Sequence, residues 1–269
     1  MNGRCEAALK KLVEQEPRKA GYSFSTWTCA ELANELARQG FEKVSRETIR
    51  VHLRALGYRV LRPVLSIASP DPAYQRKARR LEKYKKEAKK GEILLYFQDE
   101  IDLNLLPGIL RCWTLRGSQR KVMTPGVNQK RYGFGAVNYV SGHTLHRIEE
   151  HKNSAGFCTF VKHFMQTVTH SPDYHGQKII LVVDNFIIHH SQKAKAFLKQ
   201  YADQLLLFAL PTYSPWLNLI ELLWKHLRRK VTHNHLFQSI AELLEAVRSF
   251  FKALNRTPNL TLSVIGATE

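Results

Sequence analysis

Three acidic side chains stand where carboxylates could act together on one substrate. Asp99 and Asp184 directly follow Ile93–Gln98 and Lys178–Val183, two short apolar runs that are typical of buried strands. Glu221 lies within an apolar segment, where an unpaired carboxylate is costly to bury. A divalent cation shared by all three would remove this cost together with their mutual repulsion. The pattern therefore predicts a cation site built from oxygen ligands.

Oxygen ligands of this kind select a hard ion, Mg²⁺ or Mn²⁺. Two such ions ~3.5–4 Å apart can activate an attacking hydroxyl and stabilise the leaving oxygen of a phosphodiester. If the strands before Asp99 and Asp184 are parallel neighbours, their carboxyl ends place the two aspartates side by side. We therefore expect Asp99, Asp184 and Glu221 to be both the metal ligands and the catalytic residues.

Other polar residues near these carboxylates have weaker claims. Glu100 and Asp102 flank Asp99, but successive side chains of a strand point to opposite faces, so Glu100 is not expected to be a ligand, and neither is Asp102. Asn185 and His189 follow Asp184 closely. They could orient water, substrate or a carboxylate near the ions, or they could only cap the turn after the strand. Both interpretations stay open.

The composition points to a polyanionic partner. The 269 residues include 41 Lys and Arg against 23 Asp and Glu, a formal net charge of +18. Such a surplus suits nucleic acid or an anionic surface. The apolar runs are strand-sized, which excludes a membrane span, and the N-terminus lacks the apolar core of a secretory signal. The four cysteines form no C-x-x-C pair, so we expect a cytoplasmic protein without a disulfide framework.

The first 63 residues predict a small winged helix-turn-helix domain. Thr28 and Glu31 form a capping box before a helix that Gly40 ends, and Ser45 caps another helix that Gly57 ends. The order of helix, helix, connection, helix and strand is that of the winged motif. A three-helix bundle with a solvated basic face is the alternative. The expected elements are helices over Ala7–Gln15, Thr28–Gly40 and Ser45–Gly57 and a strand over Tyr58–Pro63.

Two basic helices are candidates for DNA contact. Arg46, Arg50 and Arg54 share one stripe of the third helix, as a recognition helix in the major groove requires. Pro72–Lys90 carries nine Lys or Arg and two Glu, which suits an arm along the phosphate backbone or merely a solvated helix. Further cations follow Glu221. The residues expected to bind DNA are Ser45, Arg46, Thr48, Arg50, Arg54, Arg76, Lys77, Arg80, Lys225, Arg228 and Arg229.

The chain from residue 92 to residue 255 predicts an α/β domain with a mixed sheet. Its element order, strands in a meander and then helix, strand, helix, strand and helix, is that of a ribonuclease H-like fold. We expect four regions: 1–63 for DNA binding, 64–91 as linker and basic helix, 92–255 as catalytic domain, and 256–269 as C-terminal tail. The expected strands are Ile93–Gln98, Arg111–Leu115, Arg131–Val140, His143–Ile148, Lys178–Val183 and Leu205–Leu210, and the helices are Asn153–Thr169, Ser191–Tyr201, Trp216–Val231 and Ser239–Leu254.

Four motifs in order give the chain a family resemblance over about residues 25–255. They are Leu95–Glu100, Cys112–Gly117, Val182–Asn185 with His189, and Leu210–Trp224. Together they resemble the DDE transposases of the mariner-like superfamily, in its bacterial insertion-sequence branch. The 36 residues between Asp184 and Glu221 match the spacing of that branch. The segment Trp-Leu-Asn-Leu-Ile before Glu221 departs from the usual motif but leaves the carboxylate in place.

The resemblance implies a cut-and-paste transposase in which Asp99, Asp184 and Glu221 bind Mg²⁺ or Mn²⁺, as two ions in the family's manner. Such an enzyme binds terminal inverted repeats, cuts the element's ends and joins the freed 3′-hydroxyls to a TA target. It implies a homodimer on double-stranded DNA, acting on the chromosome of a bacterial or archaeal cell. The family's DNA-binding region has two helix-turn-helix units and this chain begins near the second, so we expect an N-terminally shortened region.

Two other functions compete with this hypothesis. Another ribonuclease H-like nuclease would use the same three carboxylates, but a nuclease that recognises DNA structure does not need a helix-turn-helix. A transposase-derived DNA-binding protein without catalysis would keep the helix-turn-helix. The intact Asp99, Asp184 and Glu221 argue against that second alternative.

Overall fold

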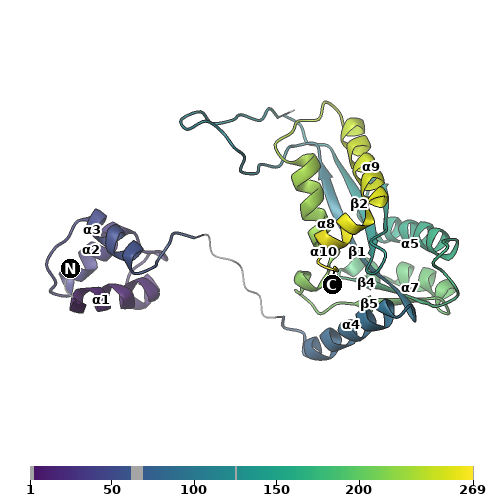
Figure 1. Ribbon diagram of the computed structural model, residues 1–269, viewed down its shortest axis with the longest axis horizontal. Coiled ribbons are helices and arrows are strands. Elements are labelled where there is room, and N and C mark those ends of the chain that lie inside the picture. The colour runs from purple at the N-terminus through teal and green to yellow at the C-terminus, as the bar shows by residue number, and fades with distance from the viewer. Residues whose placement is uncertain (1–2, 62–68, 125, 269) are drawn as a thin grey trace. The chain divides into compact units, whose positions relative to one another are not determined.

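The computed structural model describes residues 3–61, 69–124 and 126–268. The chain divides into two compact units, Met1–Ser66 and Ile67–Glu269 (Figure 1). Each unit has a hydrophobic core of its own. The expected cation site falls wholly within the second unit.

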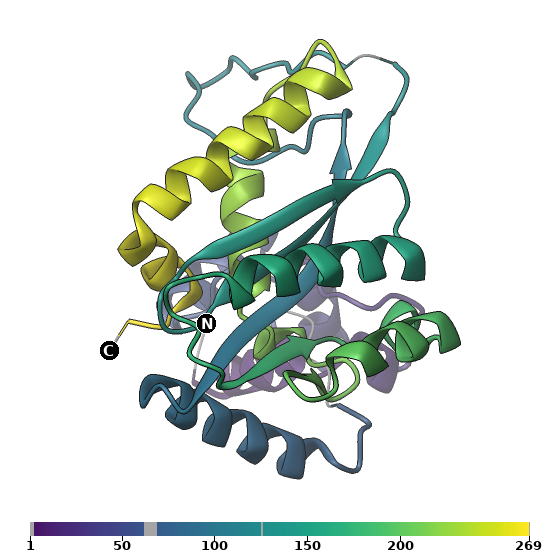
Figure 2. The same ribbon diagram turned by 90° about the vertical axis from the view of Figure 1, so that its right-hand side faces the viewer.

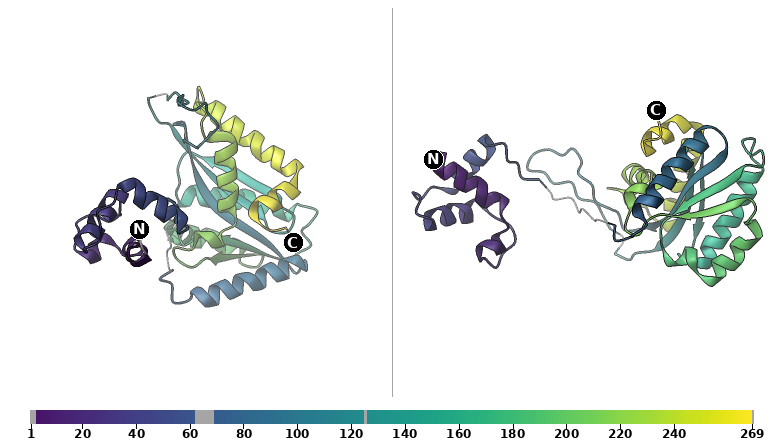
Figure 3. Two further views of the ribbon diagram at one scale, coloured as in Figure 1. Left: turned by 60° about the vertical axis from the view of Figure 1, so that its left-hand side comes forward. Right: turned by 90° about the horizontal axis from the view of Figure 1, so that it is seen from below.

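The N-terminal unit is a small helical domain (Figure 3). Its core is formed by fully buried residues that include Leu9, Leu36 and Ile49, one from each main helix. The Oγ1 of Thr28 accepts a hydrogen bond from the Glu31 amide, and Glu31 accepts one from the Thr28 amide, so the expected capping box is present. The elements are α1 (Gly3–Glu14), the short η1 (Pro17–Ala20), α2 (Cys29–Arg38) and α3 (Arg46–Ala55).

The prediction of a strand after α3 is wrong for residues 58–61, the part of it that the structure describes. Residues 58–61 have no regular secondary structure, and residues 62–63 lie outside the described part of the chain. An isolated strand leaves its backbone hydrogen-bonding groups unpaired, and the described part of this unit holds no second strand to pair with them. Tyr58 instead donates its hydroxyl hydrogen bond to Glu14 of α1. The three helices of the expected winged helix-turn-helix motif are therefore present, but the described residues form no strand that could serve as its wing.

The second unit is built on a five-stranded mixed sheet with the order β3-β2-β1-β4-β5 (Figure 2). The first three strands along the chain pair antiparallel, whereas β1, β4 and β5 pair parallel. Strand β1 is therefore the centre of the sheet and the only junction between its two halves. The strands are β1 (Ile93–Asn104), β2 (Lys130–Asn138), β3 (Thr144–Glu149), β4 (Lys178–Val183) and β5 (Leu205–Ala209).

Helices cover both faces of this sheet, as an α/β layer requires. One core joins the sheet to α5 (Ser154–Thr169), α6 (Ile187–His190) and α7 (Gln192–Leu198), followed by η2 (Lys199–Tyr201). The opposite core joins the sheet to α4 (Tyr74–Lys89), α8 (Ile220–Leu227), α9 (Ile240–Arg256) and α10 (Pro258–Ile265). Alternate residues of β1 enter the two cores, so neighbouring side chains serve different faces.

Strand β1 is longer than the sequence pattern predicts, and Asp99 lies inside it. The ladder to β2 runs from the pair Tyr96–Asn138 to the pair Asn104–Lys130 and includes the pair Asp99–Gly135. The polar residues from Asp99 onward resemble a strand end. They remain in the sheet because β2 supplies backbone partners over this whole stretch.

The expected strand Arg111–Leu115 is also wrong. These residues are irregular and lie in the long connection between β1 and β2. Trp113 is 102% and Leu115 81% exposed, so neither side chain is packed as a strand residue of the sheet would be. Apolar alternation alone predicts this strand, but β1 and β2 pair with each other directly and leave no place between them.

The late helix expected over Trp216–Val231 is divided into three segments. They are the 3₁₀ turn η3 (Pro215–Leu217), α8, and the π-helical turn η4 (Arg228–Thr232). Asn218 has an extended conformation, with φ −92° and ψ 100°, and separates η3 from α8. Glu221 therefore stands in the first turn of α8.

The C-terminal residues are not the tail that the sequence pattern predicts. Pro258 opens α10, and Gly266 ends it in a left-handed conformation with φ 67°. Thr261 and Ile265 of this helix are fully buried against the core beside α8 and α9. The last helix is thus part of the second unit.

We predict that Ile265→Ala lowers the free energy of unfolding of the second unit by about 2–5 kcal/mol, because it leaves a cavity in the core. Leu260→Ala, on the same helix but 47% exposed, is the matched control and should cost less than about 1 kcal/mol. Urea unfolding of both variants measures the difference. Equal small losses would mean that α10 does not pack as described.

Candidate active site

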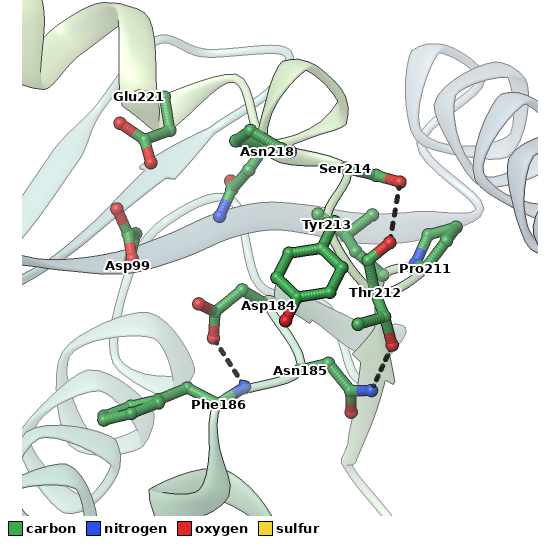
Figure 4. A pocket seen from close by; sticks show the side chains of 12 residues that line it. Asp99, Asp184, Asn185, Phe186, Pro211, Thr212, Tyr213, Ser214, Asn218 and Glu221 are labelled. Carbon is green, nitrogen blue, oxygen red and sulfur yellow. Dashed lines mark hydrogen bonds between the residues drawn. The ribbon is translucent and has the colours of Figure 1, made fainter. Parts of the chain in front are cut away.

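Asp99, Asp184 and Glu221 line one pocket at the edge of the sheet (Figure 4). Asp99 comes from β1, Asp184 directly follows β4, and Glu221 comes from α8. The two strands are parallel neighbours as expected, with Phe97 paired to Val182 two residues before each aspartate. The register therefore brings Asp99 and Asp184 to the same level of the sheet and onto the same face.

The Asp99 carboxylate is held in an environment that opposes its charge. Burial, and then the nearby charges of Glu100 and Glu221, raise the pKa of Asp99 to about 8. A backbone hydrogen bond from Glu100 acts in the other direction and lowers this pKa. The Trp224 indole Nε1 also donates a hydrogen bond to Asp99 Oδ2 at 2.9 Å. Without a cation, Asp99 therefore takes up a proton more readily than an exposed aspartate does.

Asp184 has the opposite electrostatic environment because a buried histidine lies against it. Burial would raise the pKa of Asp184, but its hydrogen bond with His189 and the charge of that ring lower it. His189 Nδ1 lies 3.2 Å from Asp184 Oδ1, and its Nε2 lies 3.1 Å from Glu100 Oε1. Burial would lower the pKa of His189, but these two carboxylates raise it to about 9. At neutral pH the ring is charged, so both nitrogens donate.

This bridge places His189 against the pocket. The residue is 1% exposed and its ring contacts the carboxylate of Asp184, which favours the interpretation that it orients a carboxylate. Asn185 also lines the pocket, where its Nδ2 donates to Thr212 Oγ1 at 2.9 Å and so links the end of β4 to the turn before η3. Glu100 lies on the opposite face of the sheet, as expected, where Gln98 Nε2 also donates to it at 2.8 Å. Asp102 is 44% exposed in its side chain and lies 3.7 Å from Lys152.

Glu221 is positioned through Asn218, which the sequence analysis did not select. Asn218 is 3% exposed, and its Nδ2 donates to the backbone oxygen of Gln98 in β1 at 2.9 Å. The Asn218 backbone oxygen in turn accepts from the Glu221 amide at 3.1 Å. The start of α8 is thereby fixed to the strand that carries Asp99. Asn218 and Trp224 each stand three residues from Glu221, and two polar donors in so apolar a segment are the signal that could have found them.

The donor set of the pocket fits a hard divalent cation. Three carboxylates from separate elements face a common space, and the raised pKa of Asp99 records a repulsion that a cation would relieve. Within residues 3–61, 69–124 and 126–268, no three His, Cys, Asp or Glu side chains are grouped closely enough to hold an ion as they stand. The carboxylates are thus near one another without closing on a single point.

The expected DNA-binding residues of α3 differ in their exposure and in the contacts that their side chains already make. Arg46 and Arg54 are exposed, whereas Arg50 is paired with Glu47 one turn earlier on the helix. Ser45 is engaged as the helix cap, because its Oγ accepts from the Thr48 amide at 3.1 Å and lies 3.0 Å from the Thr48 hydroxyl. This surface therefore offers two exposed arginines and a third that must first leave its carboxylate.

The remaining expected cations lie on α4 and around α8. Lys77 binds Asp71 at 2.8 Å, and Arg80 lies over the Tyr84 ring at 4.7 Å, whereas Arg76 is exposed. At the other end of the unit, three cations line a hollow with Leu222 and His226. They are Lys225, Arg228 and Arg229.

Comparisons with known proteins agree with this architecture. Residues 94–244 match the family model described as DDE superfamily endonuclease. The chain is 32% identical over 250 residues to the insertion element IS630 uncharacterized 39 kDa protein of Shigella sonnei, covering 93% of this chain and 71% of that protein. It resembles a crystal structure of the Mos1 mariner paired end complex with Mn, with a TM-score of 0.71, 15% identity and coverage of 97% and 74%.

A pre-cleavage Mos1 transpososome gives a similar result, with a TM-score of 0.70, 14% identity and coverage of 97% of this chain and 74% of that one. At such low identity the likeness concerns the fold alone. It confirms the expected fold class, an α/β catalytic domain of mixed sheet preceded by a helical domain.

The electrostatics of the pocket predict that Asp99→Asn stabilises the metal-free protein at high pH. The folded pKa of about 8 exceeds that of an unfolded aspartate, about 3.9, so between these values the folded state holds a proton that the unfolded chain has lost. Stability therefore falls as the pH rises through this window. Asparagine resembles the protonated form and removes the penalty.

At pH 8–9, in a chelating buffer, Asp99→Asn should unfold with a free energy higher than that of the wild type by more than about 1 kcal/mol. At pH 4 the two proteins should differ little. The exposed Asp203→Asn serves as control and should show no such pH-dependent gain. A wild-type stability that rises from pH 4 to pH 8 relative to Asp99→Asn would contradict the assigned environment.

Proposed function

The chain belongs to the DDE superfamily endonucleases, DNA-cutting enzymes, and we propose that it is an insertion-element transposase with Asp99, Asp184 and Glu221 as catalytic carboxylates. The single observation that carries this proposal is that these three side chains, from β1, the end of β4 and α8, line one pocket. Family membership gives the reaction class, cleavage and transfer of DNA strands. The pocket gives the residues.

We propose Mg²⁺ or Mn²⁺ as cofactor, as two ions held by Asp99, Asp184 and Glu221. When bound, the metal supplies a Lewis acid for the attacking and leaving oxygens of the phosphodiester. The chain's own task is to hold three carboxylates oriented around a common space. His189 does this for Asp184 through a charged hydrogen bond, and Asn218 does it for Glu221 by fixing the start of α8. Asn185 supports the facing wall of the pocket through Thr212.

DNA recognition is assigned to the N-terminal unit. In the proposal, α3 enters the major groove of a terminal inverted repeat, with Arg46, Arg50 and Arg54 on its DNA-facing stripe. Ser45 and Thr48 lie at the start of this helix, where the expected phosphate contact would compete with their capping bonds.

The second unit would contact the DNA backbone through two further groups of cations. One group is on α4. The other is on the end of α8, the helix that carries Glu221, and on η4 directly after it. These residues are Arg76, Lys77, Arg80, Lys225, Arg228 and Arg229. The net charge of +18 supports this assignment, since each neutralised phosphate releases counterions and strengthens binding.

The wider cellular setting follows from the same proposal. A cut-and-paste enzyme must hold two element ends at once, which favours a homodimer on DNA, and the family resemblance favours a TA target. We place the protein in the cytoplasm of a bacterial or archaeal cell, acting on the chromosome. No helix in the described part of the chain has the length and apolar character needed to cross a membrane.

We predict that Asp99→Asn, Asp184→Asn and Glu221→Gln each abolish Mg²⁺-dependent strand cleavage and leave DNA binding nearly unchanged. Each substitution removes a charged ligand and conserves volume. The assay is nicking of a supercoiled plasmid that carries the gene with its flanking DNA, together with a gel-shift measurement of binding. Asp102→Asn is the matched control, because Asp102 lies on β1 outside the pocket and should stay active. Cleavage by Asp184→Asn would refute the assignment.

A second prediction separates specific from general DNA binding. Arg50→Ala should weaken binding to the element's end by about 1–3 kcal/mol and leave binding to random DNA nearly unchanged. Replacing Arg76 and Arg80 together by alanine should weaken both and reduce the salt slope by about two units. Fluorescence anisotropy at several salt concentrations measures both effects. An equal loss on both DNAs from Arg50→Ala would show that α3 holds only phosphate.

A further inference from the structure

Trp224 connects the helix of Glu221 to the carboxylate of Asp99. It stands three residues after Glu221 on α8, and its side chain is 1% exposed. The only polar atom of the indole, Nε1, donates to Asp99 Oδ2 at 2.9 Å. A large buried aromatic residue of one catalytic element thus makes its single hydrogen bond with the carboxylate of another.

The strand next to Asp99 is shaped to admit this ring. Gly135 of β2 is the ladder partner of Asp99. A Cβ placed on Gly135 would lie 2.4 Å from Cη2 of Trp224, closer than such atoms approach in proteins. It would also lie 3.0 Å from Cζ2 of the same ring. A glycine inside a strand weakens that strand and commonly marks such a close approach. The indole therefore occupies the space that any other residue at position 135 would fill.

The ring is also held from the side of α9. Phe251 packs edge-on against Trp224, with ring centroids 6.1 Å apart and an interplanar angle of 84°. The indole is thus confined between β2 and α9. Because an indole N–H can only donate, a confined Trp224 presents a fixed donor to Asp99 that cannot reverse its role.

Packing alone does not account for this arrangement. A phenylalanine would fill much of the same core without a buried N–H that needs an acceptor. Gly135 also sacrifices strand stability to make room for the larger ring. Both costs are offset if the donor is needed, since an indole N–H fixed 2.9 Å from Asp99 Oδ2 holds that carboxylate in one orientation.

We propose that Trp224 is a positioning residue that holds the Asp99 carboxylate oriented toward the pocket, ready for a divalent cation. This inference rests on the proposed function, since it concerns the same carboxylates. Trp224 acts through Asp99 and has no contact with the reacting atoms in this account. Gly135 serves the same purpose by leaving space for the ring.

The test compares Mn²⁺ binding by the full chain with and without the donor. Trp224→Phe keeps an aromatic ring and removes the N–H. Mn²⁺ binding is followed by water proton relaxation on the protein alone, and the Mg²⁺ midpoint of cleavage is measured separately on DNA. A hydrogen bond to a charged group is of the size that shifts an equilibrium by about tenfold or more, so both midpoints should rise by about that factor. DNA affinity should stay unchanged.

Matched variants separate this role from general loss of packing. Phe160→Leu disturbs the core on the other face of the sheet, where Phe160 is fully buried, and should leave the Mn²⁺ midpoint unchanged. Gly135→Ala should raise it, because the new methyl group displaces the indole. Gly133→Ala is its control, since that Cβ would meet the Ile101 side chain at 2.8 Å instead of the indole.

A second replacement keeps the test decisive if Trp224→Phe does not fold. Benzothienylalanine at position 224 has nearly the shape of tryptophan, with sulfur in place of the N–H, and should raise the Mn²⁺ midpoint while the melting temperature changes little. A wild-type midpoint in either donor-free protein would overturn the inference. If the wild type itself binds no Mn²⁺ and cuts no DNA, the proposed function fails instead, so the two failures are distinguishable.

Discussion

The mutual repulsion of three partly buried carboxylates is the constraint on which the rest of the second unit depends. Asp99, Asp184 and Glu221 line one pocket, and their charges reinforce the penalty that burial already imposes on Asp99, whose pKa rises to about 8. Proteins do not keep such groups together without a compensating charge. The fold supplies one internal cation, the buried His189 between Asp184 and Glu100, and leaves the rest of the negative charge for a partner from solution.

Each carboxylate is held by a different buried side chain. Asp184 is bound by His189, Glu221 is fixed through Asn218, and Asp99 accepts from Trp224. Asn218 and Trp224 contact the central strand β1 directly, and His189 contacts it through Glu100. Strand β1 joins the parallel and antiparallel halves of the sheet. The geometry of the pocket is therefore tied to the packing of the whole unit. Because the supporting groups are themselves nearly inaccessible, solvent cannot substitute for them.

Five of the six strands expected in the second unit, and the grouping of the three carboxylates in one pocket, follow from short-range patterns in the sequence. Apolar runs followed by acids mark Asp99 and Asp184, and a charge inside an apolar helix marks Glu221. What it misses depends on partners far along the chain. The length of β1 is decided by its ladder to β2, and the absence of a strand around Trp113 follows from the direct pairing of those two strands.

The supporting groups are hidden for the same reason. The role of Trp224 requires Gly135, and these two residues are 89 positions apart with no local signal to join them. The buried face of α10 is similarly set by contacts with α8 and α9, so the sequence alone predicts only a C-terminal tail there. Local sequence patterns indicate the three candidate carboxylates, whereas the side chains that position them, such as Trp224 and Asn218, become evident only from the tertiary packing.

The central claim is that the pocket between β1, β4 and α8 binds divalent cations through Asp99, Asp184 and Glu221. Anomalous diffraction from crystals of the full chain soaked with Mn²⁺ tests it most directly. The account predicts an anomalous peak in this pocket, with carboxylate oxygens of Asp99 and Asp184 at about 2.0–2.3 Å and the Trp224 hydrogen bond to Asp99 retained. An empty pocket at saturating Mn²⁺, or ions bound only to carboxylates elsewhere on the protein, would contradict it.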